Sequence, residues 1–154
     1  MRAWRIAAPR YALDKLCIGA AMYGGRWNPV GAPAMYCGGS VAIASLEKFV
    51  HLGTAPWPEL VLVAVDIPDS GPIYTPSFAE LPDGWDAMPA SGAAQAFGGR
   101  WLAGGATLAM QVPSVIIPEE PNIILNPHHP GYADVTLTVL RTFTYDDRMQ
   151  KRTP

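Results

Sequence analysis

An arginine in a glycine-rich segment is the first side chain of this sequence that could bind an anionic ligand. Arg26 follows Gly24 and Gly25, where the lack of side chains lets a ligand approach the backbone closely. Its planar guanidinium offers directional donors that suit a phosphate or a carboxylate. The alternative is a surface turn in which Arg26 pairs with an acidic side chain while Trp27 fills the core. The residue types alone leave both interpretations open.

A glutamate in an apolar helix is the second candidate. Glu47 stands in residues 41–50, which are otherwise largely apolar. A carboxylate on such a helix costs free energy to bury unless it is paired or serves a site. The alternative is a solvent-exposed Glu47 beside Lys48. Tyr36 and Ser114 are uninformative individually, since a tyrosine in a short strand commonly belongs to the core and a serine after proline to a turn.

Common metal, nucleotide and hydrolase motifs are absent from the sequence. His128 and His129 lie between two prolines, and no Cys, Asp or Glu cluster completes a ligand set, so no metal site is predicted. The glycine pairs at 98–99 and 104–105 match neither the P-loop nor the dinucleotide fingerprint. Ser114 does not lie in a GxSxG elbow, so a serine hydrolase is not indicated.

The composition is that of an ordinary globular protein. Of its 154 residues, 49% are apolar and 16% charged, and the formal net charge is −2. Direct binding of nucleic acid is not expected, because it usually needs a strongly basic surface. The longest apolar run, residues 60–65, is too short to cross a bilayer, so we expect a cytoplasmic protein without membrane contact. Cys17 and Cys37 lack CxxC spacing and are expected to be packed, reduced thiols.

Short elements separated by loops must position these residues, because the chain has 16 prolines and 15 glycines. One helix is predicted over residues 41–50, capped by Ser40, stopped by Gly53 and buried on most sides. A second runs from Ser91 to the glycines at 104–105. The predicted strands cover residues 4–6, 35–37, 60–67, 107–112 and 135–144, with 114–117 as a continuation after Pro113.

The order of these elements favours an α+β fold over a doubly wound sheet, since strands and helices do not alternate regularly. Residues 60–67 read as a central strand, and residues 68–89 as loop. Arg26 is expected on a loop or strand edge. Residues 1–147 are predicted to form a single domain, followed by a disordered tail at 148–154.

Taken in order, five motifs resemble the RES domain family, whose name lists an Arg, a Glu and a Ser. The motifs are GRWN at 25–28, MY at 35–36, ASLE at 44–47, VPS at 112–114 and NIILNPHHP at 122–130. The resemblance spans almost the whole chain. It implies an ADP-ribosyltransferase-like fold of the diphtheria-toxin type, with a mixed, mainly antiparallel β core and a few short helices.

The resemblance assigns the catalytic site to Arg26, Tyr36, Glu47 and Ser114, with NAD⁺ as substrate and no separate cofactor. Cleavage of the nicotinamide–ribose bond develops positive charge on the ribose, which a fixed carboxylate stabilises. That role falls to Glu47. Arg26 would bind the pyrophosphate, Ser114 would bond a phosphate or orient Arg26, and Tyr36 would contact the nicotinamide side.

The same resemblance implies a wider set of NAD⁺-binding residues. These are Arg26, Trp27, Asn28, Tyr36, Ser114 and Asn126. Arg5 also falls in a family-like position. For Arg5, Asn28 and Asn126 a structural role is the alternative, and Asn126 beside Pro127 is typical of a turn.

Members of the family are toxins of bacterial type II toxin–antitoxin pairs, and their partner is an Xre-type helix-turn-helix antitoxin. The resemblance therefore implies a toxin that hydrolyses or phosphorolyses NAD⁺ and arrests growth. Two alternatives remain open, an ADP-ribosyltransferase that modifies one host protein and a non-enzymatic module that only binds the antitoxin. Residues 68–92 match no motif, so the sequence does not decide whether water, phosphate or a protein accepts the ADP-ribose. A homodimer within the toxin–antitoxin complex is a further expectation.

Overall fold

The polypeptide forms seven strands and three α-helices within residues 1–53 and 56–149, which the computed structural model describes. The strands are β1 (Arg2–Ala7), β2 (Met35–Gly38), β3 (Leu60–Asp66), β4 (Ile73–Tyr74), β5 (Ala109–Pro113), β6 (Pro121–Leu125) and β7 (Thr136–Phe143). The helices are α1 (Ile18–Tyr23), α2 (Val41–Phe49) and α3 (Gly92–Gly104).

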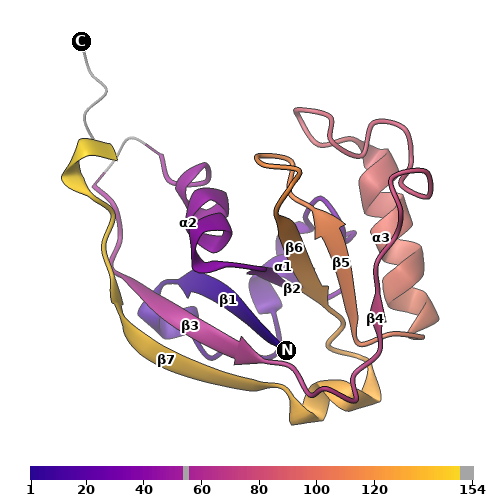
Figure 1. Cartoon of the computed structure of the whole chain (residues 1–154), viewed down its shortest axis with the longest axis horizontal. Helices are drawn as coiled ribbons and strands as arrows, with labels where there is room; N and C mark the ends of the chain where they lie inside the picture. The colour runs from indigo at the N-terminus through magenta and orange to yellow at the C-terminus, as the bar shows by residue number, and fades with distance from the viewer. Residues whose placement is uncertain (54–55, 150–154) are drawn as a thin grey trace.

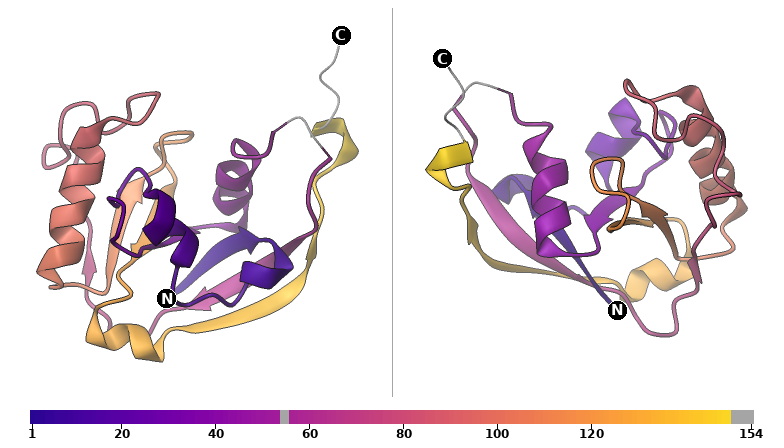
Figure 2. Two further views of the ribbon diagram at one scale, coloured as in Figure 1. Left: turned by 180° about the vertical axis from the view of Figure 1, so that it is seen from behind. Right: turned by 45° about the horizontal axis from the view of Figure 1, so that its top comes forward.

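All seven strands belong to one sheet, in the order β4-β5-β6-β2-β1-β3-β7. Neighbouring strands are antiparallel except β4 and β5, which are parallel. The β5–β6 hairpin stands between α2 and α3 (Figure 1), and α1 lies on the far side of the sheet in that view, as the reverse view of Figure 2 shows. This architecture confirms the α+β class with a mainly antiparallel core and few short helices.

Strand β3 is held on both sides, as its β-branched sequence predicts. It pairs with β1 over six residue pairs and with β7 over its whole length. Residues 60–65 are all buried, which explains why apolar residues run through this strand without alternation. The outer neighbour, β7, lies within the predicted range 135–144 and has no buried residue.

Helix α2 begins where the sequence predicts and ends earlier. The Ser40 hydroxyl accepts a hydrogen bond from the backbone N–H of Ile43 at 3.2 Å, which confirms the N-cap. The helix ends at Phe49, so Gly53 is not its stop. Only Ile43 and Ala44 are buried. Ala42 is the one exposed residue of the helix and the other six are partly buried, so α2 is less buried than predicted although it packs on β1, β2 and β6.

Helix α3 packs directly against the backbone of the segment that carries Arg26. Its predicted ends are confirmed, with Ser91 before the first turn and Gly105 as C-cap at φ +61°. A Cβ atom on Gly98 would collide with the carbonyl oxygen of Trp27. Glycine at this position therefore sets the distance between the helix and the Trp27 segment.

Several elements differ from the sequence prediction. Residues 114–117 form a loop and not a strand, because the Ser114 hydroxyl accepts from the N–H groups of Ile116 and Ile117 and closes a turn. Helix α1, strand β4 and strand β6 were not predicted. Cys17 and Cys37 are buried and free, as expected. Of the predicted disordered tail, residues 148–149 lie in a 3₁₀ helix (Asp147–Met149) and residues 150–154 lie outside the described residues.

The close contact at Gly98 predicts a specific intolerance. Gly98→Ala should lower the free energy of unfolding by roughly 1–3 kcal/mol, because the added methyl group forces the helix away from Trp27. Urea unfolding followed by circular dichroism measures this change. Gly104→Ala on the same helix is the matched control, since no heavy atom lies within 4 Å of its Cβ position. That variant should be neutral or more stable by up to ~1 kcal/mol. Equal destabilisation by both substitutions would contradict the packing argument.

Candidate functional site

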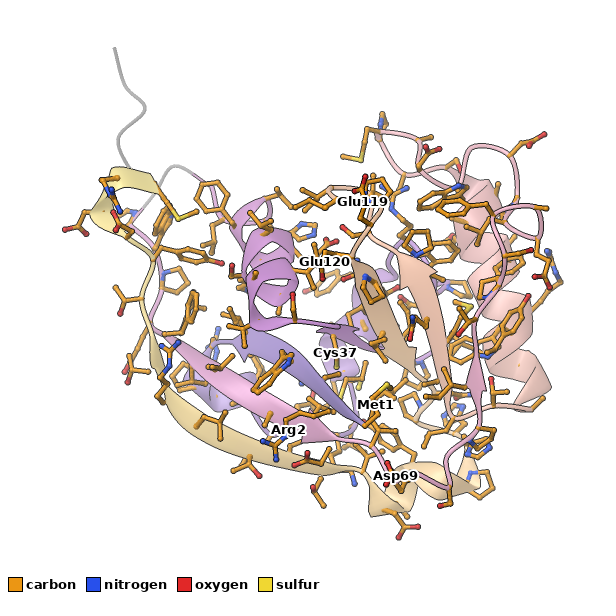
Figure 3. The ribbon with its side chains drawn as sticks, viewed as in Figure 1. Met1, Arg2, Cys37, Asp69, Glu119 and Glu120 are labelled. Atoms are coloured by element: carbon orange, nitrogen blue, oxygen red, sulfur yellow. The ribbon has the colours of Figure 1, made fainter. Side chains whose placement is uncertain are left out.

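A cavity of about 250 Å³ lies between helix α2 and strands β1, β2 and β6. Its polar lining consists of Arg5 of β1, Tyr36 of β2, Glu47 and Lys48 of α2, His51 just after that helix, and Asn122 of β6. Cys37, which Figure 3 labels near the middle of the sheet, lines it as well. The ionisable side chains of the lining all come from the first 51 residues, and the second half of the chain adds the neutral amide of Asn122.

The Glu47 carboxylate is held by two neutral donors. Its Oε1 accepts hydrogen bonds from the Ser114 hydroxyl at 2.8 Å and from the Asn122 amide at 2.6 Å. Among the described residues no group bonds to Oε2. Neutral donors fix a carboxylate without cancelling its charge. The side chain is half-buried, so the charge faces a partly desolvated cavity.

Ser114 acts on Glu47 from beneath the surface. It is fully buried, and its backbone N–H donates to the carbonyl of Glu120 at 2.9 Å. Its hydroxyl oxygen accepts hydrogen bonds from the backbone N–H groups of Ile116 and Ile117, which closes the turn. The same hydroxyl donates its proton to the Glu47 carboxylate. The structure thus brings Ser114 and Glu47 together. No contact between Ser114 and Arg26 is found in the described part of the chain.

Tyr36 connects the cavity to the glycine-rich segment. Its hydroxyl donates to the Asn28 side-chain oxygen at 2.7 Å and accepts from the Trp27 N–H at 3.0 Å. Burial raises the pKa of Tyr36 well above its ordinary value, so the phenol stays neutral. A Cβ on Gly25 would lie 2.6 Å from the Tyr36 hydroxyl, which explains the glycine at that position.

Two asparagines from the predicted binding set hold loops. Asn28 is fully buried, and its amide donates to the carbonyls of Ala20 and Ala32 at 2.9 and 2.8 Å. Asn126 is also buried, and its side-chain oxygen accepts from the His128 N–H at 3.0 Å. Both arrangements match the structural alternative for these residues, and neither side chain lines the cavity.

Arg26 lies on a loop, as predicted, but away from the cavity lining. Its guanidinium donates to the carbonyls of Trp85 and Ala87 at 2.8 and 3.0 Å and lies 3.0 Å from the Met88 sulfur. Trp27 is buried and stacks on Trp85, with ring centroids 6.2 Å apart. These two predicted binding residues therefore anchor residues 85–88 to the Arg26 loop in this structure.

Lys48 and Asn122 were not assigned to the site from the sequence, and Arg5 was left between a binding and a structural role. The Nη1 atom of Arg5 is buried without a hydrogen-bond partner among the described residues. The pKa of Lys48 is lowered, first by burial and then by the charge of Arg5. A signal for Lys48 was present in its position next to Glu47 on an otherwise apolar helix.

Within residues 1–53 and 56–149, no group of three or more His, Cys, Asp or Glu side chains is arranged to hold a metal ion. No helix there is long and apolar enough to cross a membrane.

Comparison with known proteins gives a consistent result. The model of the RES domain family matches residues 2–146. The Prs ADP-ribosylating toxin of Sphingobium sp. (strain YBL2) is 41% identical, over 97% of this chain and 96% of that protein. A Toxin Res of Yersinia enterocolitica is 33% identical, over 97% of this chain and 100% of that protein.

One solved structure shows the same fold. A chain in the crystal structure of the M. tuberculosis MbcT–MbcA toxin–antitoxin complex superposes with a TM-score of 0.67 at 18% identity. The superposition covers 97% of this chain and 86% of that chain. The shared fold agrees with the ADP-ribosyltransferase-like α+β architecture expected from the sequence.

Proposed function

The chain belongs to the RES domain family and is a toxin of that family, and we propose that it acts by cleaving the nicotinamide–ribose bond of NAD⁺. The observation that carries this proposal is the Glu47 carboxylate, fixed by Ser114 and Asn122 inside a cavity. NAD⁺ is a cytoplasmic metabolite, so the proposal places the toxin's action in the cytoplasm.

Glu47 would act on the charge that develops as the bond breaks. When the bond between the ribose C1 and the nicotinamide nitrogen breaks, its electron pair stays on the nitrogen, so nicotinamide leaves as a neutral molecule. The ribose becomes an oxocarbenium-like cation, which a preorganised carboxylate stabilises in a site of low dielectric. Because Oε1 is occupied by Ser114 and Asn122, Oε2 is the oxygen left to face the ribose.

The remaining predicted site residues take different parts in this proposal. Tyr36 lines the cavity as a neutral phenol and offers its ring to the nicotinamide side. Ser114 is a positioning residue, because it reaches the substrate only through Glu47. Arg26 uses its Nη1 atom for the carbonyls of Trp85 and Ala87, so a phosphate bound there would accept from its Nε and Nη2 atoms.

Removing the charge of Glu47 tests the proposal directly. Glu47→Gln should lower the rate of nicotinamide release from NAD⁺ by roughly 10²–10³-fold, because the amide keeps the shape but not the charge that stabilises the cation. Chromatography of released nicotinamide measures the rate, and Glu119→Gln, an exposed carboxylate on the β5–β6 loop, is the control.

Two results would go against an enzyme of this kind. One is a wild-type protein that releases no nicotinamide with water, phosphate or protein as acceptor. The other is growth arrest that survives Glu47→Gln, which would favour a non-enzymatic module that binds only an antitoxin.

Transfer of ADP-ribose to a protein is the second candidate function. It is favoured by the 41% identical relative, which is named as a Prs ADP-ribosylating toxin. Both functions share the bond cleavage and differ only in the acceptor. With NAD⁺ labelled in its ADP-ribose part, we expect free ADP-ribose, or ADP-ribose phosphate when phosphate is present, in amounts equal to the nicotinamide released. Label found mainly on one protein of a cell lysate would establish the second candidate instead.

We further propose that a cognate antitoxin, an Xre-type helix-turn-helix protein, binds this toxin and covers the cavity. The proposal is supported by the names of the relatives and by the toxin–antitoxin complex that shares the fold. Co-expression with the neighbouring open reading frame should yield a stable complex in which nicotinamide release is suppressed. Size-exclusion chromatography with light scattering would reveal the complex, and would also test the proposed toxin homodimer within it. Separate elution of the two proteins would exclude that pairing.

A further inference from the structure

Two cations line the cavity beside Glu47 and form no ion pair with any described residue, and we propose that they form the subsite for the pyrophosphate of the substrate. The residues are Arg5 of β1 and Lys48 of α2. This inference rests on the proposed function and deepens it, since it names Lys48 as a binding residue and moves the pyrophosphate away from Arg26.

Both cations have N–H donors that bond to no described residue. The Nη1 atom of Arg5 is buried and has no hydrogen-bond partner among the described residues. A buried donor without a partner costs free energy, and a ligand that supplies an acceptor removes this cost, which favours binding. Lys48 forms no hydrogen bond or ion pair with any residue that the structure describes.

The two cations also repel each other in a partly desolvated cavity. The pKa of Lys48 is lowered, with burial as the larger cause and the charge of Arg5 as the second. Glu47 is the one carboxylate in the cavity lining, and its Oε1 is bonded to Ser114 and Asn122. The cavity without substrate therefore has more positive than negative charge.

The chemistry of the two side chains suits a diphosphate. A guanidinium donates in a planar fork to two oxygens, and an ammonium adds a compact positive charge. A pyrophosphate carries two negative charges and can contact both side chains at once. In NAD⁺ the pyrophosphate is joined through one methylene group to the ribose whose bond to nicotinamide is proposed to break.

The helix places the two parts of the substrate next to each other. Glu47 and Lys48 are consecutive in α2, so their side chains leave the axis about 100° apart, and both line the cavity. Glu47 can face the ribose while Lys48 faces the adjoining phosphates. Arg26, in contrast, already donates to Trp85 and Ala87 and is not part of this lining.

ADP-ribose is the probe for this subsite, because it contains the pyrophosphate but no nicotinamide. In titration calorimetry on the full chain, Lys48→Met should weaken ADP-ribose binding by roughly tenfold or more, the loss expected for a charge-assisted hydrogen bond. Lys48→Arg should bind within about threefold of wild type. Arg10→Gln, an exposed cation outside the cavity, is the control and should bind as wild type does.

A pH profile separates a binding role from a structural one. Because the charged ammonium binds the anion, ADP-ribose affinity should be highest below the lowered pKa of Lys48 and should fall as the pH rises through that pKa. Lys48→Arg should remove that fall, because arginine stays charged. The other titratable groups of the cavity are the same in both proteins, namely Arg5, Tyr36, Cys37, Glu47 and His51.

The outcomes are distinguishable from failure of the proposed function. Absence of nicotinamide release by the wild-type protein overturns NAD⁺ cleavage, whereas ADP-ribose affinity is measured without catalysis. Wild-type affinity in Lys48→Met overturns the subsite, and so does loss of affinity in Arg26→Gln alone. If Lys48→Met unfolds at the assay temperature, Lys48→Gln takes its place under the same criteria.

Discussion

The hydrogen bonds that Glu47 accepts from Ser114 and Asn122 are the interaction on which the site depends. They join helix α2 to the β5–β6 hairpin. Such donors offset the cost of burying part of a carboxylate, and the donors in turn need the hairpin loop to hold its shape. The turn closed by Ser114 provides that shape, so the serine serves the fold and the charge of Glu47 together.

A second network fixes the wall of the cavity opposite the helix. Tyr36 bonds to Asn28 and to the Trp27 backbone, and Asn28 bonds to two carbonyls of its own loop. Gly25 and Gly98 allow the loop to approach Tyr36 and α3 at distances that any side chain would prevent. The glycine-rich segment therefore works here by permitting close packing of protein on protein.

The sequence predicted the parts of the fold that have strong local signals. Strand β3 has a β-branched run and α3 has a capping glycine, and both were located correctly. Strand β6 was missed because its five residues begin at a proline and are recognisable mainly by their pairing with β2 and β5. Helix α1 was missed because it is only six residues long, contains Gly19 and ends at Gly24.

The sequence named candidate site residues but not how they are arranged in space. Glu47 could be identified as a candidate from the sequence, because its carboxylate interrupts an otherwise apolar helix. The contact between Glu47 and Ser114 spans 67 residues, and no local pattern encodes such a contact. The partners of Arg26 are backbone carbonyls, which any residue type provides, so its attachment to residues 85–88 had no sequence signature.

That wide separation along the chain also decides when, during synthesis, the site can exist. Glu47 is made early, but Ser114 and Asn122 follow 67 and 75 residues later. At roughly 5–20 residues per second, several seconds of translation pass before the carboxylate has its donors. Nascent chains shorter than the β5–β6 hairpin therefore lack the two donors that hold the Glu47 carboxylate in place.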